Sequence, residues 1–136
     1  MKVPKRKTKQ RELIRSALSS ADGPLSPSEI LELSKEDCPS ISLATVYRAL
    51  KSLLKDEEVV SVPVPGEPDR YETAHCAHRH HHHFHCDGCG KVYHIEGCPE
   101  GLRALVPKGF TMMRHEIMLY GNCDWCKNEF RSSKLT

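Results

Sequence analysis

The chain has 136 residues, of which 38% are hydrophobic and 28% are charged, with 20 Lys and Arg against 18 Asp and Glu. This length suits one or two small domains, and no apolar run reaches the roughly 18 residues that a membrane-spanning helix needs. The first ten residues carry charges with no apolar core after them, so we expect a cytoplasmic protein with no signal peptide and no membrane partner.

The net charge of +2 conceals an uneven distribution. Residues 1–60 carry 11 Lys and Arg against 9 Asp and Glu, whereas residues 61–136 carry 9 of each. All nine histidines and six of the seven cysteines follow residue 70. A basic N-terminal half and a C-terminal half rich in metal-ligand residue types argue against a single uniform domain. They also argue against a disulfide scaffold for the whole chain.

The first half of the chain predicts three helices. Apolar side chains recur at a helical period over residues 8–19, and Asp22-Gly23-Pro24 ends that helix. Residues 26–29 (Ser-Pro-Ser-Glu) form a capping box that begins the second helix, which stops before Pro39. A third helix is expected over residues 42–56, with Ser42 as its N-cap.

Short strands are expected at residues 59–62 and 70–73, around a turn rich in Pro and Gly. Three helices and a β-hairpin make a winged helix-turn-helix. The second half predicts three strand-like segments, at residues 84–86, 91–95 and 111–120. It also predicts one short helix within residues 99–106. The expected fold class is therefore α+β, with a winged-helix domain over residues 1–74 and a small α/β domain over residues 75–136.

Two Cys-x-x-Cys pairs, Cys86-Asp87-Gly88-Cys89 and Cys123-Asp124-Trp125-Cys126, are separated by 33 residues. Each two-residue gap lets a tight turn aim both sulfurs at one point, and two such turns supply the four thiolates of a tetrahedral zinc site. A redox Cys-x-x-Cys is the alternative, but neither pair opens a helix after a strand in a βαβ pattern. We therefore expect one structural Zn²⁺ per chain, which would stabilise a domain with a modest core.

The densest run of metal-ligand residue types is 75–86, which includes four consecutive histidines. On a strand, alternate side chains face opposite sides, so His81 and His83 would face one way and His80 and His82 the other. One segment would then serve two separate metal sites. A solvated polar loop is the alternative interpretation of this run.

These features resemble the ferric uptake regulator (Fur) family of bacterial metal-dependent repressors. The matching stretches follow the family's order along nearly the whole chain: residues 41–50 (ISLATVYRAL), Arg70-Tyr71-Glu72, residues 80–83, residues 86–92 (CDGCGKV), His115, and residues 119–123 (LYGNC). The resemblance implies an N-terminal winged helix for DNA and a C-terminal α/β domain for dimerisation. It also implies a corepressor metal at the hinge that locks the two DNA-binding domains.

By this resemblance, the helix over residues 42–56 enters the major groove of operator DNA, where Tyr47 and Arg48 match the family's contacting pair. Arg48 suits a bidentate contact to guanine or phosphate, and Tyr47 suits a thymine methyl or a sugar, with a core position for Tyr47 as the alternative. The basic N-terminus would hold the DNA backbone or the minor groove. The expected DNA-binding set is Lys5, Arg6, Lys7, Arg11, Ser42, Thr45, Tyr47, Arg48 and Lys51.

The resemblance also implies two metal sites besides the four cysteines. The regulatory hinge site would take Cys76, His81, His83 and one of Glu72 or His94, and a second site would take His80, His82, Glu100 and His115. Cys76 resembles the cysteine that zinc uptake regulators place in the hinge site, and a thiolate favours zinc or another thiophilic ion. The chain departs from iron- and peroxide-responsive members at residues 24–26, which lack their histidine, and at His94, where the family often has an acid.

The resulting expectation is a zinc-responsive repressor, similar to the zinc uptake regulator branch, that binds double-stranded operator DNA as a homodimer when its regulatory Zn²⁺ site is filled. An iron-responsive or peroxide-sensing regulator that uses Fe²⁺ or Mn²⁺ is the alternative. No His-Glu-x-x-His motif occurs, so we expect neither an enzyme nor a small-molecule substrate. We interpret Cys38 and Cys98 as small buried or half-buried residues, with Cys98 also close enough to His94 in sequence to be an opportunistic ligand.

Overall fold

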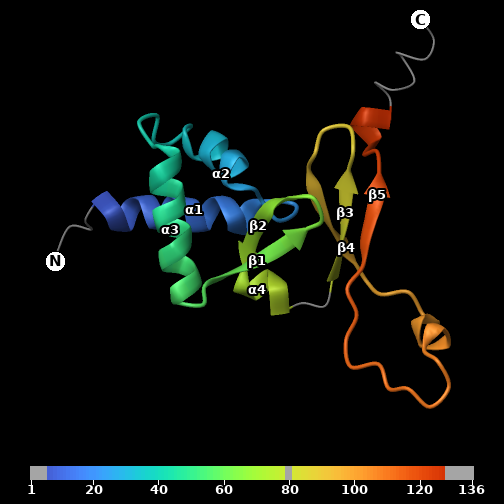
Figure 1. Ribbon diagram of the computed structural model, residues 1–136. Coiled ribbons are helices and arrows are strands. Elements are labelled where there is room, and N and C mark those ends of the chain that lie inside the picture. Colours follow the sequence, from blue (N-terminus) through green and yellow to red (C-terminus); the bar gives the residue numbers. More distant parts are fainter. Residues whose placement is uncertain (1–5, 79–80, 128–136) are drawn as a thin grey trace, which may run out of the picture. The chain divides into compact units, whose positions relative to one another are not determined.

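The computed structural model describes residues 6–78 and 81–127, and the chain forms two compact units, residues 1–79 and residues 80–136 (Figure 1). The first domain was expected to end at residue 74, whereas the boundary between the two units falls after residue 79. The difference arises because a short helix, α4 (Ala74–His78), packs on the hairpin of the first unit, where the Ala74 N–H donates to the Glu58 carbonyl at 2.9 Å. No helix in the described ranges is long and apolar enough to cross a membrane.

The first unit contains three helices followed by a β-hairpin, which is the expected winged helix-turn-helix, and ends with α4. The helices are α1 (Arg6–Ser20), α2 (Pro27–Ser34) and α3 (Leu43–Lys55), and the antiparallel strands are β1 (Val59–Val64) and β2 (Glu67–Thr73). The hairpin is joined to the loop before α2 by a pair of backbone hydrogen bonds between Leu25 and Tyr71, at 2.8 and 2.9 Å.

The expected helix caps are present. Ser26 Oγ accepts from the Glu29 N–H at 3.2 Å, and the Glu29 carboxylate accepts from the Ser26 N–H at 3.0 Å, which confirms the capping box. At the start of α3, Ser42 Oγ accepts from the Thr45 N–H at 3.2 Å. These bonds satisfy N–H groups that a helix start otherwise leaves to water, and they fix where α2 and α3 begin.

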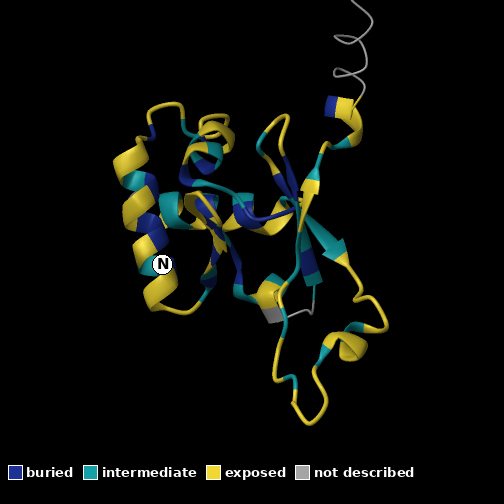
Figure 2. Cartoon of the chain, turned by 45° about the vertical axis from the view of Figure 1, so that its right-hand side comes forward, coloured by how far each residue is buried: buried dark blue, intermediate teal, exposed yellow. Residues whose placement is uncertain are grey.

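One continuous apolar core holds the first unit together. Figure 2 shows the buried positions on the inward faces of its helices and hairpin, with exposed positions along the outward side of α3. The side chains of the core are Ile14, Leu18, Ile30, Ile41, Val46, Ala49, Leu50, Leu53 and Val59. A buried Arg70 supports this packing, because its guanidinium contacts the Glu29 carboxylate and donates to the Pro24 carbonyl at 3.3 Å.

The second unit is a three-stranded sheet in the order β4-β3-β5. The central strand β3 (His81–Cys86) pairs antiparallel with β4 (Val92–Glu96) and parallel with β5 (Met118–Gly121), and a short 3-10 helix spans Leu102–Leu105. The strand expected over residues 111–120 was wrong for residues 111–117. Residue-by-residue pairing with β3 begins at Met118, and just before it the Ile117 carbonyl accepts from the His83 N–H at 3.1 Å, so residues 111–116 precede the described strand.

Candidate metal centres and DNA-binding surface

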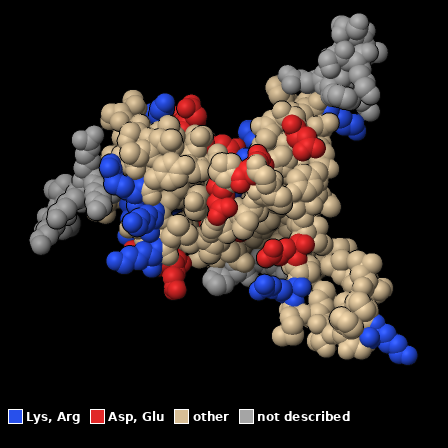
Figure 3. Space-filling view, viewed as in Figure 1, with Lys and Arg blue, Asp and Glu red and all other residues tan. Residues whose placement is uncertain are grey.

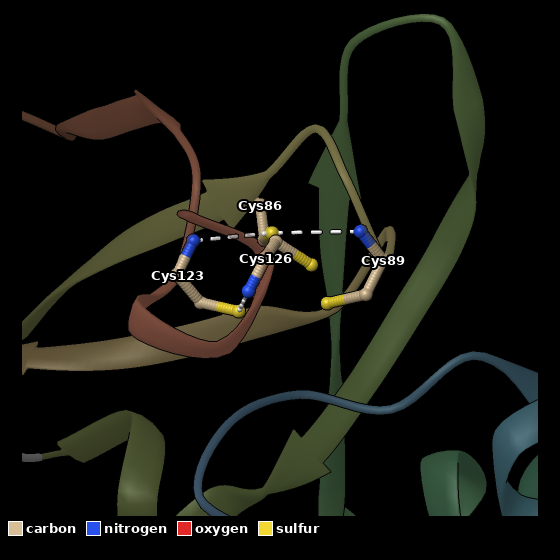
Figure 4. A group of neighbouring side chains, drawn as sticks. All are labelled: Cys86, Cys89, Cys123 and Cys126. Carbon is tan, nitrogen blue, oxygen red and sulfur yellow. Dashed lines mark hydrogen bonds between the residues drawn. The ribbon is translucent and has the colours of Figure 1, made fainter. Parts of the chain in front are cut away.

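The first metal-ligand group is the four-cysteine cluster expected from the sequence (Figure 4). Cys86 ends β3, Cys89 follows on the adjoining turn, and Cys123 and Cys126 follow β5. The parallel pairing of β3 with β5 aligns Cys86 with Gly121, which brings the two Cys-x-x-Cys turns together. The four sulfur atoms all lie within 4.8 Å of one another, and all seven cysteines of the chain are free of disulfides.

The geometry of this cluster fits a tetrahedral zinc ion. A Zn–S bond of about 2.3 Å places tetrahedral sulfurs about 3.8 Å apart, so the four sulfurs need only small shifts to surround one ion. The N–H groups of Cys89 and Cys123 donate to the Cys86 sulfur at 3.5 and 3.3 Å. Gly88 permits the close approach, because a Cβ there would lie 2.8 Å from the Cys126 side chain. The cluster therefore fits a structural zinc site.

The thiols of the cluster differ in their readiness to ionise. Burial opposes ionisation of Cys86, but the N–H groups of Cys123 and Cys89, together with the side chains of the same two residues, lower the pKa of its thiol to about 6. Burial and the neighbouring cysteine side chains, Cys123 first among them, raise the pKa of Cys126. Without a cation, close thiols do not all ionise together, and a bound Zn²⁺ supplies the charge that makes four thiolates compatible.

A second group consists of three histidines on one face of the sheet. The register pairs His83 with His94, and the alternation along β3 places His81 on the same face as His83. The ring centroid of His81 lies 4.4 Å from that of His94 and 5.1 Å from that of His83, and one nitrogen of each ring lies within 4.8 Å of the others. The expected sharing of a face by His81 and His83 is thus present, and His94 joins them.

The other two residues expected in the hinge site belong to the first unit. Glu72 lies on β2 opposite Val60, and Cys76 lies on α4, where its N–H donates to the Thr73 hydroxyl at 3.3 Å. Cys76 is half-buried. Their participation in a site with the three histidines stays a prediction.

A third group lies on the other face of β3 and comprises His82, Cys98 and His115, with one ligand atom of each within 4.8 Å of the others. Of the expected members of the second site, His82 and His115 are brought together, whereas His80 lies outside the described residues. Glu100 is exposed and does not belong to this group. The sequence offered Cys98 only as a small buried or half-buried residue or as an opportunistic ligand near His94, whereas it is exposed and lies with His82 and His115.

The candidate DNA-binding surface is the outward face of α3. Val46, Leu50 and Leu53 face the core, which leaves Tyr47 51% exposed, and this rules out the alternative of a core tyrosine. Arg48 and Lys51 are exposed beside it, and Figure 3 shows Lys and Arg side chains gathered on this side of the first unit.

Polar contacts order the start of this face. Arg48 donates to Thr45 Oγ1 at 3.0 Å, and Thr45 Oγ1 lies 3.0 Å from Ser42 Oγ. Polar side chains also line a groove of about 690 Å³ between the start of α1 and α3, which is bordered by Thr8, Gln10, Arg11, Ser40, Ser42, Thr45, Arg48, Ala49 and Ser52. The face thus presents a cation and hydroxyl groups in a fixed arrangement.

The basic residues before α3 are placed differently from one another. Arg11 forms ion pairs with Asp56, at 2.9 Å, and with Glu58, so two carboxylates already bind its guanidinium within the unit. Arg6 and Lys7 lie in α1, and Lys5 lies outside the described residues. A DNA contact by Lys5, Arg6, Lys7 or Arg11 stays a prediction.

Comparison with known proteins gives a consistent set of relatives. The sequence model of the Ferric uptake regulator family matches residues 2–120. The ferric uptake regulation protein of Campylobacter jejuni is 34% identical over 133 residues, which cover 94% of this chain and 83% of the relative. That of Bacillus subtilis (strain 168) is 32% identical over 128 residues, which cover 90% of this chain and 85% of the relative.

Solved structures agree with these relatives. The Helicobacter pylori ferric uptake regulator, described as having three functional metal binding sites, matches with a TM-score of 0.65 and 28% identity, over 88% of this chain and 80% of that one. A zinc-bound manganese uptake regulator shares the fold, with a TM-score of 0.72 and 24% identity over 90% of this chain and 91% of that one.

Proposed function

The chain belongs to the ferric uptake regulator family, and from this premise we propose that it is a zinc-responsive repressor that binds operator DNA as a homodimer. Membership makes it a metal-responsive transcription regulator. We propose further that zinc is the signal and that the genes it represses serve metal uptake. We also propose that the protein works in the cytoplasm and is not an enzyme. The observation that carries it is the convergence of His81, His83 and His94, which supplies three metal-ligand nitrogens on the unit that follows the winged helix.

The face of α3 supports DNA binding by this chain. Arg48 presents a planar guanidinium that suits a guanine edge or a phosphate, and the exposed ring of Tyr47 suits a thymine methyl or a sugar. Lys51, also exposed, would contact the phosphate backbone, together with Ser42, Thr45 and the basic start of α1. The phosphate contacts would make the affinity fall steeply as the salt concentration rises.

Ligand chemistry supports zinc as the regulatory metal. Three imidazoles accept several transition metals, so the fourth ligand decides the preference. Cys76 would supply a thiolate, which favours zinc, whereas Glu72 would supply a carboxylate, which suits iron(II) and manganese(II) as well. We propose Cys76, His81, His83 and His94 as the ligands, with Glu72 as the alternative to His94 or as an additional ligand.

Regulation follows if the ligands are drawn from both units. Cys76 and Glu72 belong to the unit that carries α3, and the histidines belong to the other, so a metal held by both would favour one arrangement of the two. A change of 10–100-fold in DNA affinity corresponds to roughly 1.4–2.7 kcal/mol of coupling. One metal site per subunit is sufficient for that amount.

Exposed apolar side chains on the second unit support the homodimer. Leu105, Phe110, Met113 and Trp125 are each more than 60% exposed, and Tyr120 on the edge strand β5 is 51% exposed. Exposed large apolar side chains suit an interaction surface, and a symmetric dimer would bury the same residues of both subunits.

The experiment that tests this function is a DNA-binding titration with Cys76→Ser. We expect the variant to need a higher free zinc concentration before it binds duplex DNA, while one zinc per chain stays in the four-cysteine cluster. Cys38→Ser is the matched control, because Cys38 is half-buried in the first unit with its sulfur 3.9 Å from the Ser40 hydroxyl. Equal zinc activation of both variants would contradict the role of Cys76.

The iron-responsive or peroxide-sensing alternative is retained because the relatives reported above include ferric uptake regulation proteins. Iron(II) or manganese(II) would then activate DNA binding and zinc would not. The same titration, repeated with each metal, separates the two functions.

A further inference from the structure

The group of His82, Cys98 and His115 joins three segments that are distant in sequence. His82 lies on β3 and is 3% exposed, Cys98 follows the end of β4, and His115 precedes β5. The Cys98 sulfur lies 3.0 Å from His115 Nε2, and the ring centroids of His82 and His115 are 5.1 Å apart. A thiol and two imidazoles thus face one another on one face of the sheet.

These distances fit a single ion. Zn–N bonds of about 2.0 Å and Zn–S bonds of about 2.3 Å place tetrahedral ligand atoms about 3.3–3.8 Å apart. The three ligand atoms lie within 4.8 Å of one another, so rotation of the side chains alone is enough to bring them to that spacing. One sulfur and two nitrogens select zinc or another thiophilic ion over magnesium, calcium or manganese, which prefer oxygen.

We propose that His82, Cys98 and His115 bind a thiophilic divalent cation, with Cys98 taking the place of the carboxylate that we expected from Glu100. The proposal deepens the second metal site of the proposed function, but it concerns metal binding alone and does not require DNA binding. Three protein ligands leave one tetrahedral position for water or for a further side chain.

Binding at this site would also close a loop. The 97–117 segment between β4 and β5 contains only the short 3-10 helix, and Figure 2 shows it as mostly exposed. It carries the exposed Leu105, Phe110 and Met113 of the proposed dimer surface. Cys98 and His115 stand near its two ends, 17 residues apart, so one ion held with His82 would fasten both ends to β3. Such a crosslink reduces the number of conformations open to the segment.

The first test measures zinc and cobalt(II) binding by a Cys38→Ser/Cys76→Ser double variant whose four-cysteine cluster has been filled with zinc. In this variant Cys98 is the only thiol outside that cluster. Added cobalt(II) should give a thiolate-to-cobalt charge-transfer band, and zinc should displace it. A further Cys98→Ser change should abolish the band and weaken zinc binding at the site by more than about tenfold.

Glu100→Gln is the matched variant, because it removes a charged ligand candidate two residues from Cys98. We expect it to leave both the band and the zinc affinity unchanged. Two results would overturn the proposal: binding by Cys98→Ser equal to that of the parent, which would leave Cys98 and His115 as a simple hydrogen-bonded pair, or a loss on Glu100→Gln, which would restore the carboxylate as the ligand.

A second readout follows the loop itself. Arg103, Lys108 and Arg114 are exposed trypsin sites within the 97–117 segment. Zinc should slow cleavage at these sites in the parent and not in Cys98→Ser, as followed by mass spectrometry. Equal protection of both proteins would contradict loop closure through Cys98. Neither assay contains DNA, so a failure here is distinguishable from a failure of the proposed repressor function.

Discussion

The two units of this chain are stabilised in different ways. The first unit buries nine apolar residues in one cluster that is shared by its three helices and its hairpin. In the described part of the second unit, the buried hydrophobic residues are Val92 and two cysteines of the four-cysteine cluster, Cys86 and Cys126. Apolar burial contributes about 1.5–3 kcal/mol for each large side chain, so it supports the first unit and leaves the second dependent on other interactions.

This contrast between the two units indicates which of them would depend on a bound metal. A structural zinc site contributes an apparent 10–16 kcal/mol of binding free energy in small domains, which exceeds what Val92 and its neighbours supply. The unit with the apolar core presents α3, whereas the unit with the small core carries three groups of metal ligands. The same small sheet thus carries a cluster that fits a structural metal and the ligands that we propose for the signal.

The largest expected effect follows removal of the zinc that we expect in the four-cysteine cluster. A strong chelator, or Cys86→Ser, should unfold the second unit while the first retains its helices, because only the second depends on the cluster. Hydrogen exchange followed by mass spectrometry should show loss of protection in β3 and β5 but not in α3. Retained protection in β3 of the zinc-free protein would remove the contrast between the units.

The converse change is Leu50→Ala. Leu50 is 2% exposed in the core of the first unit, so its truncation should lower the free energy of unfolding of that unit by about 2–5 kcal/mol. Thermal unfolding monitored by helical circular dichroism measures this loss. The zinc content should stay at that of the parent, and a matching loss of zinc would show that the two units depend on the same interactions.

The DNA-binding face gives the next effect. Arg48→Ala should weaken binding to a specific duplex by about 1–3 kcal/mol, roughly 5–150-fold, without changing zinc content. Lys55→Ala is the control, since Lys55 is also exposed but lies at the C-terminal end of α3. Fluorescence anisotropy measures both, and an unchanged affinity for Arg48→Ala would refute its role.

The smallest effect concerns pH. The Cys86 thiol, with a pKa of about 6, is mostly ionised near neutral pH, whereas the raised pKa of Cys126 keeps its thiol protonated. Zinc binding must therefore release a proton, and its affinity should rise about tenfold per pH unit for each proton released.

Below about 6, Cys86 also binds a proton, so the affinity should fall more steeply as the pH decreases further. Calorimetric titration in buffers of different ionisation enthalpy counts the protons. A pH dependence that does not steepen below about 6 would be inconsistent with the hydrogen bonds found at Cys86.

Much of the first unit could be predicted from the sequence because its signals are local. Ser26 and Glu29 cap a helix three residues apart, and Ser42 precedes an apolar stripe, so neither requires knowledge of distant segments. The two Cys-x-x-Cys pairs are local in the same sense, and the strand alternation correctly separated His82 from His81 and His83.

The features that were missed depend on pairing between distant segments. Residues 111–117 have strand-like composition, but parallel pairing with β3 begins only at Met118. The contact between Cys98 and His115 spans 17 residues of a segment with little regular structure, so spacing alone favoured neither Cys98 nor Glu100. Helix α4 has no apolar periodicity over its five residues, so the sequence offered no signal for it.

The most direct test of the central claim is a metal series in a DNA-binding assay. The four-cysteine cluster is first filled with zinc, and duplexes are enriched from a random pool separately with zinc, iron(II) and manganese(II). We predict that zinc enriches a specific duplex and raises its affinity by about 10–100-fold over protein in which only the cluster is filled. Affinity that does not change with any added metal, or that rises with iron(II) or manganese(II) but not with zinc, would contradict the account.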